Sequence, residues 1–137
     1  MNRNLFFATR VIAVLLPVLG CRGASEVSPE GCRHNVEIAV LPGANPVFSW
    51  SPRCGVSTLS VSTVPSAPGA VEETMWGFSV PEQTPLGPRI PYGIAPSRAT
   101  IWIQPRALQT GSKYRVSVWY TVGGDVLTGG GERVFTH

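Results

Sequence analysis

The clearest pattern in the chain is the return of an apolar residue at every second position from Tyr114 to Val122. These apolar positions are Tyr114, Val116, Val118, Tyr120 and Val122. A period of two residues is typical of a β-strand that buries one face and exposes the other. The pattern therefore predicts a half-buried strand, with Arg115, Ser117 and Trp119 on its solvent-facing side.

Shorter stretches of the same kind predict six further strands. They cover residues 36–41, 46–50, 56–64, 75–80, 99–104 and 132–136. Turn-forming residues separate them, for example Pro42-Gly43 and Gly123-Gly124-Asp125. Residues 70–74 are an exception, because one helical turn is expected there. Many short strands joined by turns predict an all-β chain, with about seven strands in a two-sheet antiparallel β-sandwich.

The segment from Pro81 to Pro96 differs from the rest of the chain because it contains five prolines. A proline has no amide hydrogen to donate, so this segment is excluded from the centre of a sheet. We expect it to form an extended loop along a sheet edge.

Two local patterns resemble the fibronectin type III domain. One is Trp50-Ser51-Pro52, at the end of the second predicted strand. The other is Leu108, Gly111 and Tyr114, which lie three residues apart ahead of the strongest strand and resemble a tyrosine corner. The resemblance implies a fibronectin type III-like sandwich over residues 36–137.

The chain also departs from the related families. An immunoglobulin domain would have a cysteine where this chain has Val116, which favours the fibronectin type. The proline-rich segment replaces a compact connection before the fifth strand of the family. The last predicted hairpin has Gly123-Gly124-Asp125 instead of the Arg-Gly-Asp of some family members. The resemblance therefore implies a fold and no ligand.

The first 20 residues have the features of a secretory signal peptide. Arg3 and Arg10 precede an apolar stretch from Val11 to Leu19 that is too short to span a membrane. Val18-Leu19-Gly20-Cys21 resembles the lipobox of bacterial lipoproteins, which implies that Cys21 is lipidated and becomes the mature N-terminus. The alternative is an ordinary thiol at Cys21 after a conventional signal peptide.

The lipid at Cys21 predicts a bacterial protein anchored at the cell envelope. Several acyl chains give stable anchoring to a membrane. The next residue is Arg22 and not aspartate, so the outer membrane is expected if the host has two membranes. Residues 21–35 are polar and lack periodicity, which predicts a flexible tether between the lipid and the domain.

The net charge of the chain limits the classes of partner that are expected. The formal net charge is +3, but Arg3 and Arg10 belong to the predicted signal peptide, which leaves nine Lys and Arg against eight Asp and Glu. A net charge of +1 gives no basic surface for phosphate groups, so nucleic acid is not an expected partner.

Two cysteines remain once Cys21 is assigned to lipid. Cys32 precedes the first predicted strand and Cys54 follows the second, and an exported protein meets oxidising surroundings. A Cys32–Cys54 disulfide is predicted, worth roughly 3 kcal/mol by loop closure. The alternatives are separate thiols or a Cys21–Cys32 pair. Adding His34 and His137 gives no metal-ligand spacing, so neither a metal nor another cofactor is expected.

Catalytic groups are sparse. The two histidines are near the two ends of the predicted domain, Asp125 is in a glycine turn, and no Gly-x-Ser-x-Gly motif is present. Glu72 and Glu73 are adjacent and project differently, which indicates surface charge in a loop. The chain is therefore predicted not to be an enzyme, and a small envelope hydrolase stays as an alternative.

The four tryptophans are the remaining candidates for function. Trp50 and Trp76 share the apolar phase of their strands and are predicted to be core residues. Trp119 has the opposite phase to the apolar positions of its strand and is expected on an outer surface beside Arg115. Trp102 is likewise expected there if Ile101 and Ile103 point inward.

Such a surface suits a binding or structural module whose partner is an envelope protein or glycan, because exposed aromatic rings stack on sugars or anchor proteins. A carbohydrate- or peptidoglycan-binding module is the named alternative. Against both stands the possibility that the proline-rich segment folds over the two rings.

Overall fold

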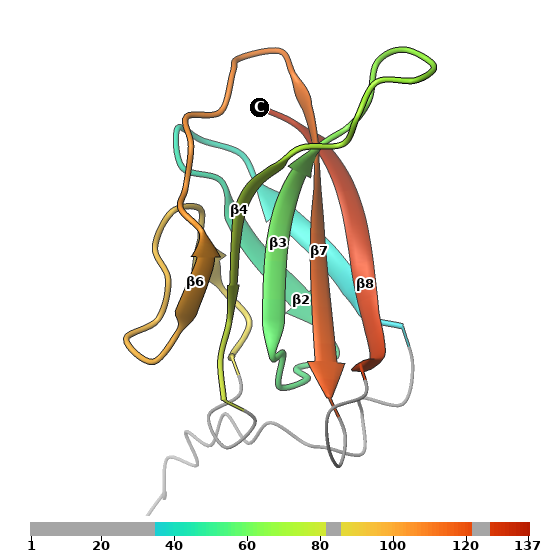
Figure 1. Cartoon of the computed structure of the whole chain (residues 1–137). Coiled ribbons are helices and arrows are strands. Elements are labelled where there is room, and N and C mark those ends of the chain that lie inside the picture. Colours follow the sequence, from blue (N-terminus) through green and yellow to red (C-terminus); the bar gives the residue numbers. More distant parts are fainter. Residues whose placement is uncertain (1–34, 82–85, 122–126) are drawn as a thin grey trace, which may run out of the picture.

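The computed structural model describes residues 35–81, 86–121 and 127–137. In these ranges the chain forms eight strands in two antiparallel sheets (Figure 1). The smaller sheet has the order β1-β2-β5, with β1 at Glu37–Leu41, β2 at Val47–Ser51 and β5 at Ile90–Pro91. The larger has the order β6-β4-β3-β7-β8. Its strands are β6 (Thr100–Ile103), β4 (Thr74–Ser79), β3 (Thr58–Thr63), β7 (Lys113–Thr121) and β8 (Leu127–Thr136).

This arrangement confirms the predicted all-β, two-sheet antiparallel sandwich, with eight strands instead of about seven. Within the described ranges, no helix is long and apolar enough to cross a membrane. The predicted signal peptide (1–20), the tether up to residue 34 and the turn Gly123-Gly124-Asp125 lie outside the described residues.

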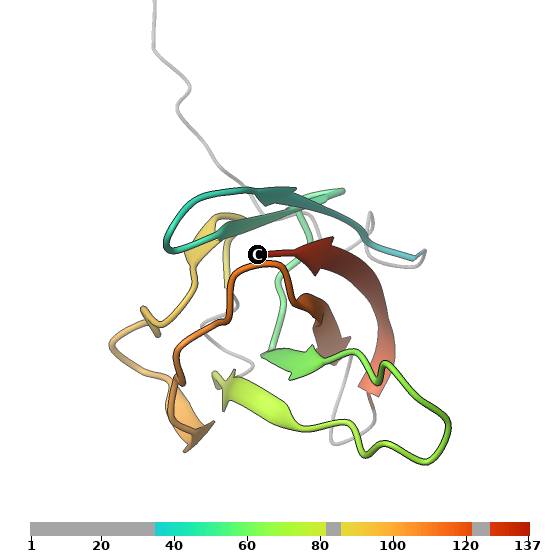
Figure 2. The same ribbon diagram turned by 90° about the horizontal axis from the view of Figure 1, so that it is seen from above.

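The core lies between the two sheets, which pack face to face (Figure 2). β7 contributes to it as its alternation predicted, since Tyr114, Val116, Val118 and Tyr120 are at most 4% exposed. The predicted core tryptophans are also buried. Trp50 is held further by a hydrogen bond from its Nε1–H to the carbonyl of Cys54, at 3.0 Å.

The turn that enters β7 is a tyrosine corner, as the spacing of three predicted. The amide of Gln109 donates a hydrogen bond to Tyr114 Oη at 2.8 Å, and Leu108 packs against the core. Gly111 has a φ of +81°, a conformation that glycine adopts without steric cost. The corner fixes the start of β7 and hence the face on which each of its side chains lies.

The proline-rich segment does more than follow a sheet edge. Its two-residue strand β5 pairs with β2 and forms an edge of the smaller sheet, and Leu86 exchanges two backbone hydrogen bonds with Val56. Tyr92 is inserted into the core, in edge contact with Phe48 and Trp76. The described part of the segment therefore closes one side of the sandwich. Trp102 remains 48% exposed beside it.

The single helical turn expected at residues 70–74 is wrong. Thr74 instead opens β4 and pairs with Ser62. The preceding Glu73 is tied to Thr63 through two bonds: Thr63 N–H donates to the Glu73 carbonyl at 2.8 Å, and Glu73 N–H donates to Thr63 Oγ1 at 2.9 Å. These backbone groups serve the strand pairing, so they are not available for a helical turn.

β8 starts at Leu127, five residues before the predicted start, and includes the run Gly129-Gly130-Gly131. Each of these glycines is closely approached by another part of the chain. A Cβ atom would overlap Tyr120 Oη at Gly129, the carbonyl of Val118 at Gly130 and the carbonyl of Val36 at Gly131. Val36 N–H also donates to the Gly130 carbonyl at 3.1 Å. The described chain thus enters the sandwich against β8.

Candidate binding site

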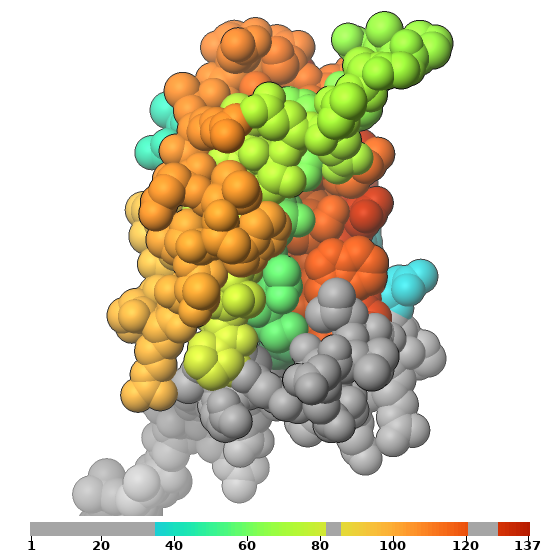
Figure 3. Space-filling view, in the orientation of Figure 1, coloured from blue at the N-terminus to red at the C-terminus, as the bar shows by residue number. Residues whose placement is uncertain are grey.

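The three predicted surface residues lie on one face of the molecule. Trp102 belongs to β6, and Arg115 and Trp119 belong to β7, all on the side of the five-stranded sheet that faces away from the smaller sheet. Figure 3 shows this side, with the β6 side chains over β4 and a strip of β3 between them and β7. We call this surface the outer face. It consists of Ser60, Gly77, Trp102, Arg115, Ser117 and Trp119.

Trp102 is the most exposed aromatic residue of the outer face, and its ring lies flat on Gly77. A Cβ atom built on Gly77 would overlap the ring atoms Cη2, Cζ2 and Cζ3, which lie at nearly equal distances within 2.6 Å of that position. Near-equal distances mean that the ring presents its face, not its edge, to the backbone. Trp102 is 48% exposed, so the opposite face of the ring is open to solvent.

The expected side of Trp102 depended on Ile101 and Ile103 pointing into the core, but Ile101 is 39% exposed. β6 is the outermost strand of its sheet and pairs only with β4. An edge strand of this kind has little core to reach on its inner side. Trp102 nevertheless takes the predicted side, because a register shift next to Gly77 seats its ring on the bare glycine backbone.

Small residues form the floor between Trp102 and β7. The pairing of β4, β3 and β7 places Gly77, Ser60 and Ser117 in one row across the sheet. A neighbouring row contains Ser79, Thr58 and Trp119. These hydroxyl groups both donate and accept hydrogen bonds. The floor is therefore polar but carries no charge.

The charged groups of the outer face are paired, with one arginine between two glutamates. Arg115 Nη1 lies 3.0 Å from Glu72 Oε2, and Arg115 Nε lies 3.6 Å from Glu132 Oε2. Ser117 Oγ lies 3.4 Å from the other oxygen of Glu132. Exposed pairs of this kind contribute little stability. Their effect is to hold Arg115 between two carboxylates instead of leaving it to attract an anion.

A hollow of about 440 Å³ lies at the Trp119 end of the outer face. Asn35, Val36, Trp119, Glu132 and the glycine run of β8 line it. The Trp119 ring leans over Gly130, where a Cβ atom would come within 2.9 Å of ring atom Cε3. The absence of side chains on the glycines thus makes room for both the ring and the hollow.

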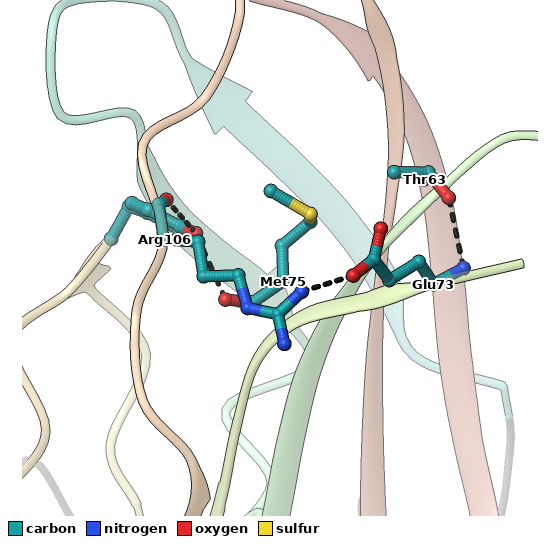
Figure 4. Close-up of polar contacts among 5 residues, drawn as sticks. Thr63, Glu73, Met75 and Arg106 are labelled. Atoms are coloured by element: carbon teal, nitrogen blue, oxygen red, sulfur yellow. Dashed lines mark hydrogen bonds and ion pairs between the residues drawn. The ribbon is translucent and has the colours of Figure 1, made fainter.

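The position of β6 is fixed by contacts at its C-terminal end (Figure 4). Arg106 N–H donates to the carbonyl of Met75 at 3.1 Å, and the Arg106 guanidinium pairs with Glu73. The hydroxyl of Tyr92 donates to the carbonyl of Arg106 at 2.8 Å. Burial is the main reason why the pKa of Tyr92 is raised above its ordinary value. These contacts hold the segment after β6 against β4, and so hold Trp102 over Gly77.

A larger hollow, of about 800 Å³, lies at the tyrosine-corner end of the sandwich. Several of its polar wall groups already have structural partners. Glu73 pairs with Arg106, Thr63 accepts from Glu73, and Tyr114 accepts from Gln109. The outer face has the most exposed aromatic ring among the described residues, and it is therefore the candidate site.

The other sequence-predicted residues are not gathered at this site. Cys21, Cys32, His34 and Asp125 lie outside the described residues. Cys54 is fully buried, and His137 is half-buried beside the tyrosine corner. Glu72 and Glu73 point to different arginines, Arg115 and Arg106. In the described part of the chain, no three His, Cys, Asp or Glu side chains are grouped so as to hold a metal ion.

Sequence reasoning missed the glycines of the site. Gly77 supports Trp102, and the run Gly129-Gly130-Gly131 supports Trp119. A glycine inside a strand pattern indicates that something approaches the backbone closely, and this feature was present in the sequence. In the comparisons with known proteins, no protein family, no curated protein and no solved structure matches this chain.

Proposed function

We propose that this protein is a non-enzymatic binding module, held at the bacterial cell envelope by lipid on Cys21, with the outer face as its binding surface. The observation that carries the proposal is the Trp102 ring, which lies flat on Gly77 with its other face open to solvent. Arg115 and Trp119 lie on the same side of the same sheet. Aromatic rings exposed in this way serve as anchors in binding surfaces.

The proposed domain type is a fibronectin type III-like sandwich over residues 36–137. Two antiparallel sheets, the tyrosine corner at Tyr114 and Trp50-Ser51-Pro52 at the end of β2 support this assignment. β6 is the main departure from a compact sandwich, and it is also the strand that carries Trp102.

The absence of catalysis is part of the proposal. Two features of the described residues support it. Glu72 and Glu73 pair with different arginines. His137 follows the end of β8 beside the tyrosine corner, whereas the hollow beside Trp119 lies near the start of β8. A paired-carboxylate or histidine-based hydrolase needs such groups within reach of one reacting atom.

Lipid anchoring is tested by the intact mass of the protein extracted from bacterial membranes. We expect the mass of residues 21–137 plus acyl groups, and a Cys21→Ser variant that is released from the membrane. An unlipidated product in the soluble fraction would reject the anchor.

Binding is tested with the Cys21→Ser full chain, which isolates the outer face from the lipid. The protein is mixed with washed cell envelopes of its host and sedimented. We expect it in the pellet, and we expect Trp102→Ala to move most of it to the supernatant. Leu41→Ala is the matched control, because Leu41 is 51% exposed on the other sheet. Equal sedimentation of the Trp102→Ala and Leu41→Ala variants would reject the outer face as the binding surface.

A further inference from the structure

We infer that the ligand of the outer face is a chain of uncharged sugars that crosses the strands from Trp102 to the hollow beside Trp119. This inference rests on the proposed binding function and names its ligand class. Four properties of the outer face support it.

The first property is the orientation of the Trp102 ring. Because the ring lies parallel to the sheet on Gly77, its free face forms a flat platform level with the surface. The face of an aromatic ring is electron-rich and attracts the weakly positive C–H groups on the flat side of a sugar ring. An edge-on ring would offer no such platform.

The second property is the floor beside this platform. Ser60 and Ser117 follow Gly77 across the sheet, and Thr58 lies next to Trp119. All three hydroxyl side chains are half-buried and so remain within reach of solvent. Sugar hydroxyls need partners that both donate and accept hydrogen bonds, which is what serine and threonine provide.

The third property is charge. Arg115 lies between the carboxylates of Glu72 and Glu132, so two negative charges surround one positive charge. One of these carboxylates, Glu132, lies in the wall of the hollow beside Trp119. An anionic polymer would meet repulsion there instead of attraction.

The fourth property is length. Three strand-to-strand steps separate β6 from β7, which puts the backbones of Trp102 and Trp119 roughly 15 Å apart. Their rings lie over Gly77 in β4 and Gly130 in β8, which are also three steps apart. One sugar ring cannot touch both. A chain that stacks on Trp102 and ends in the hollow uses the aromatic groups and the floor together.

A folded protein partner fits this surface less well. Protein interfaces have an apolar centre and bury about 800 Å² on each side. Of the apolar side chains on the outer face, Trp102 and Val134 belong to the two edge strands, and Trp119 is half-buried at one end. The row between them consists of Gly77, Ser60 and Ser117 and has no large apolar side chain.

The test uses the Cys21→Ser full chain, titrated with the hexamers of N-acetylglucosamine and of glucose, both β-1,4-linked and neutral. Tryptophan fluorescence and calorimetry report binding, and polygalacturonate is the anionic comparison. We expect at least one neutral hexamer to bind, and Trp102→Ala to weaken its affinity at least tenfold. We expect Leu41→Ala to leave it unchanged.

Gly77→Ala provides a second variant, because it keeps the tryptophan and displaces its ring from the sheet. It should weaken hexamer binding as Trp102→Ala does, while circular dichroism shows an unchanged sandwich. Binding of polygalacturonate alone, no binding of either hexamer, or full affinity in both variants would overturn the inference.

Envelope sedimentation separates this inference from the proposed function. Envelopes digested with protease should still retain the protein, and envelopes digested with glycosidases should lose it. Retention that is sensitive to protease but not to glycosidase, and still dependent on Trp102, would overturn the sugar ligand while leaving the binding module in place.

Discussion

Tyr92 shows how one residue joins the proline-rich segment to the core. Its ring packs against Phe48 and Trp76, and its hydroxyl donates to the carbonyl of Arg106 at the end of the β6 region. Only the protonated phenol can donate this bond. The burial that raises its pKa therefore also makes the neutral form part of the fold.

The raised pKa of Tyr92 predicts a loss of stability at alkaline pH. The phenol is neutral in both states below about pH 10, the ordinary pKa of tyrosine. As the pH rises through the higher pKa of the folded state, its contribution to the free energy of unfolding is lost. Urea unfolding of the wild type should therefore show a fall in stability that begins near pH 10.

Tyr92→Phe should lose about 1 kcal/mol at neutral pH with the hydrogen bond, and should show a shallower fall above pH 10. An identical alkaline slope in the variant and the wild type would count against the role of Tyr92.

The glycine run of β8 acts at the scale of the strands. It lets β1 start directly against β8, because Gly131 has no Cβ to meet the carbonyl of Val36. It also makes room for the ring of Trp119 over Gly130. One run of three glycines thus positions both a neighbouring strand and part of the outer face.

Gly131→Ala should destabilise the protein by about 1 to 3 kcal/mol, the range for overpacking a well-packed position. The new methyl group would overlap the Val36 carbonyl and break the hydrogen bond from Val36 to Gly130. Thermal unfolding measures the loss. Gly87→Ala is the control, because a Cβ there has open space around it. Equal stability of the two variants would show that β1 can move aside at no cost.

Strands with a clear alternation could be predicted from the sequence, and others could not. β7 was predicted to within one residue because its side chains alternate between core and solvent. β5 has two residues, and β8 begins in a glycine-rich stretch without side chains to alternate. β5 and the start of β8 are strands because they pair with strands that are distant in the sequence, and such pairing leaves no local sequence pattern.

The same holds for the candidate site. Alternation along β7 was enough to put Arg115 and Trp119 on the outer face. Alternation along β6 predicted the same face for Trp102, but a register shift next to Gly77 is what places it there. The alternation of side chains could not show that the Trp102 ring lies flat, because its orientation depends on the pairing of β6 with β4 at Gly77. The exposure of Ile101 depends in the same way on β6 being the edge strand.

At the scale of the whole molecule, the first residue of β1 lies opposite the last residue of β2. Glu37 pairs with Ser51, so the chain before β1 and the chain after β2 leave the sandwich at the same end. Cys54 is fully buried at that end, and its carbonyl accepts the hydrogen bond of Trp50. This places Cys54 where a cysteine just ahead of β1 could reach it.

A Cys32–Cys54 disulfide is therefore still predicted. The intact mass should rise by two hydrogens on reduction, and Cys32→Ala should lower the free energy of unfolding by about 3 kcal/mol. Alkylation of both cysteines in denatured, unreduced protein would contradict the bond.

The hydrogen bond from Val36 to Gly130 fixes the point where the chain joins the sandwich, at the end that holds the hollow beside Trp119. Residues 22–35 connect Val36 to Cys21, and these 14 residues span at most about 50 Å. For a protein anchored by lipid at Cys21, this length limits how far the hollow beside Trp119 can lie from the membrane that carries the lipid. The outer face could therefore meet only envelope polymers that come within that distance plus the extent of the face beyond the hollow.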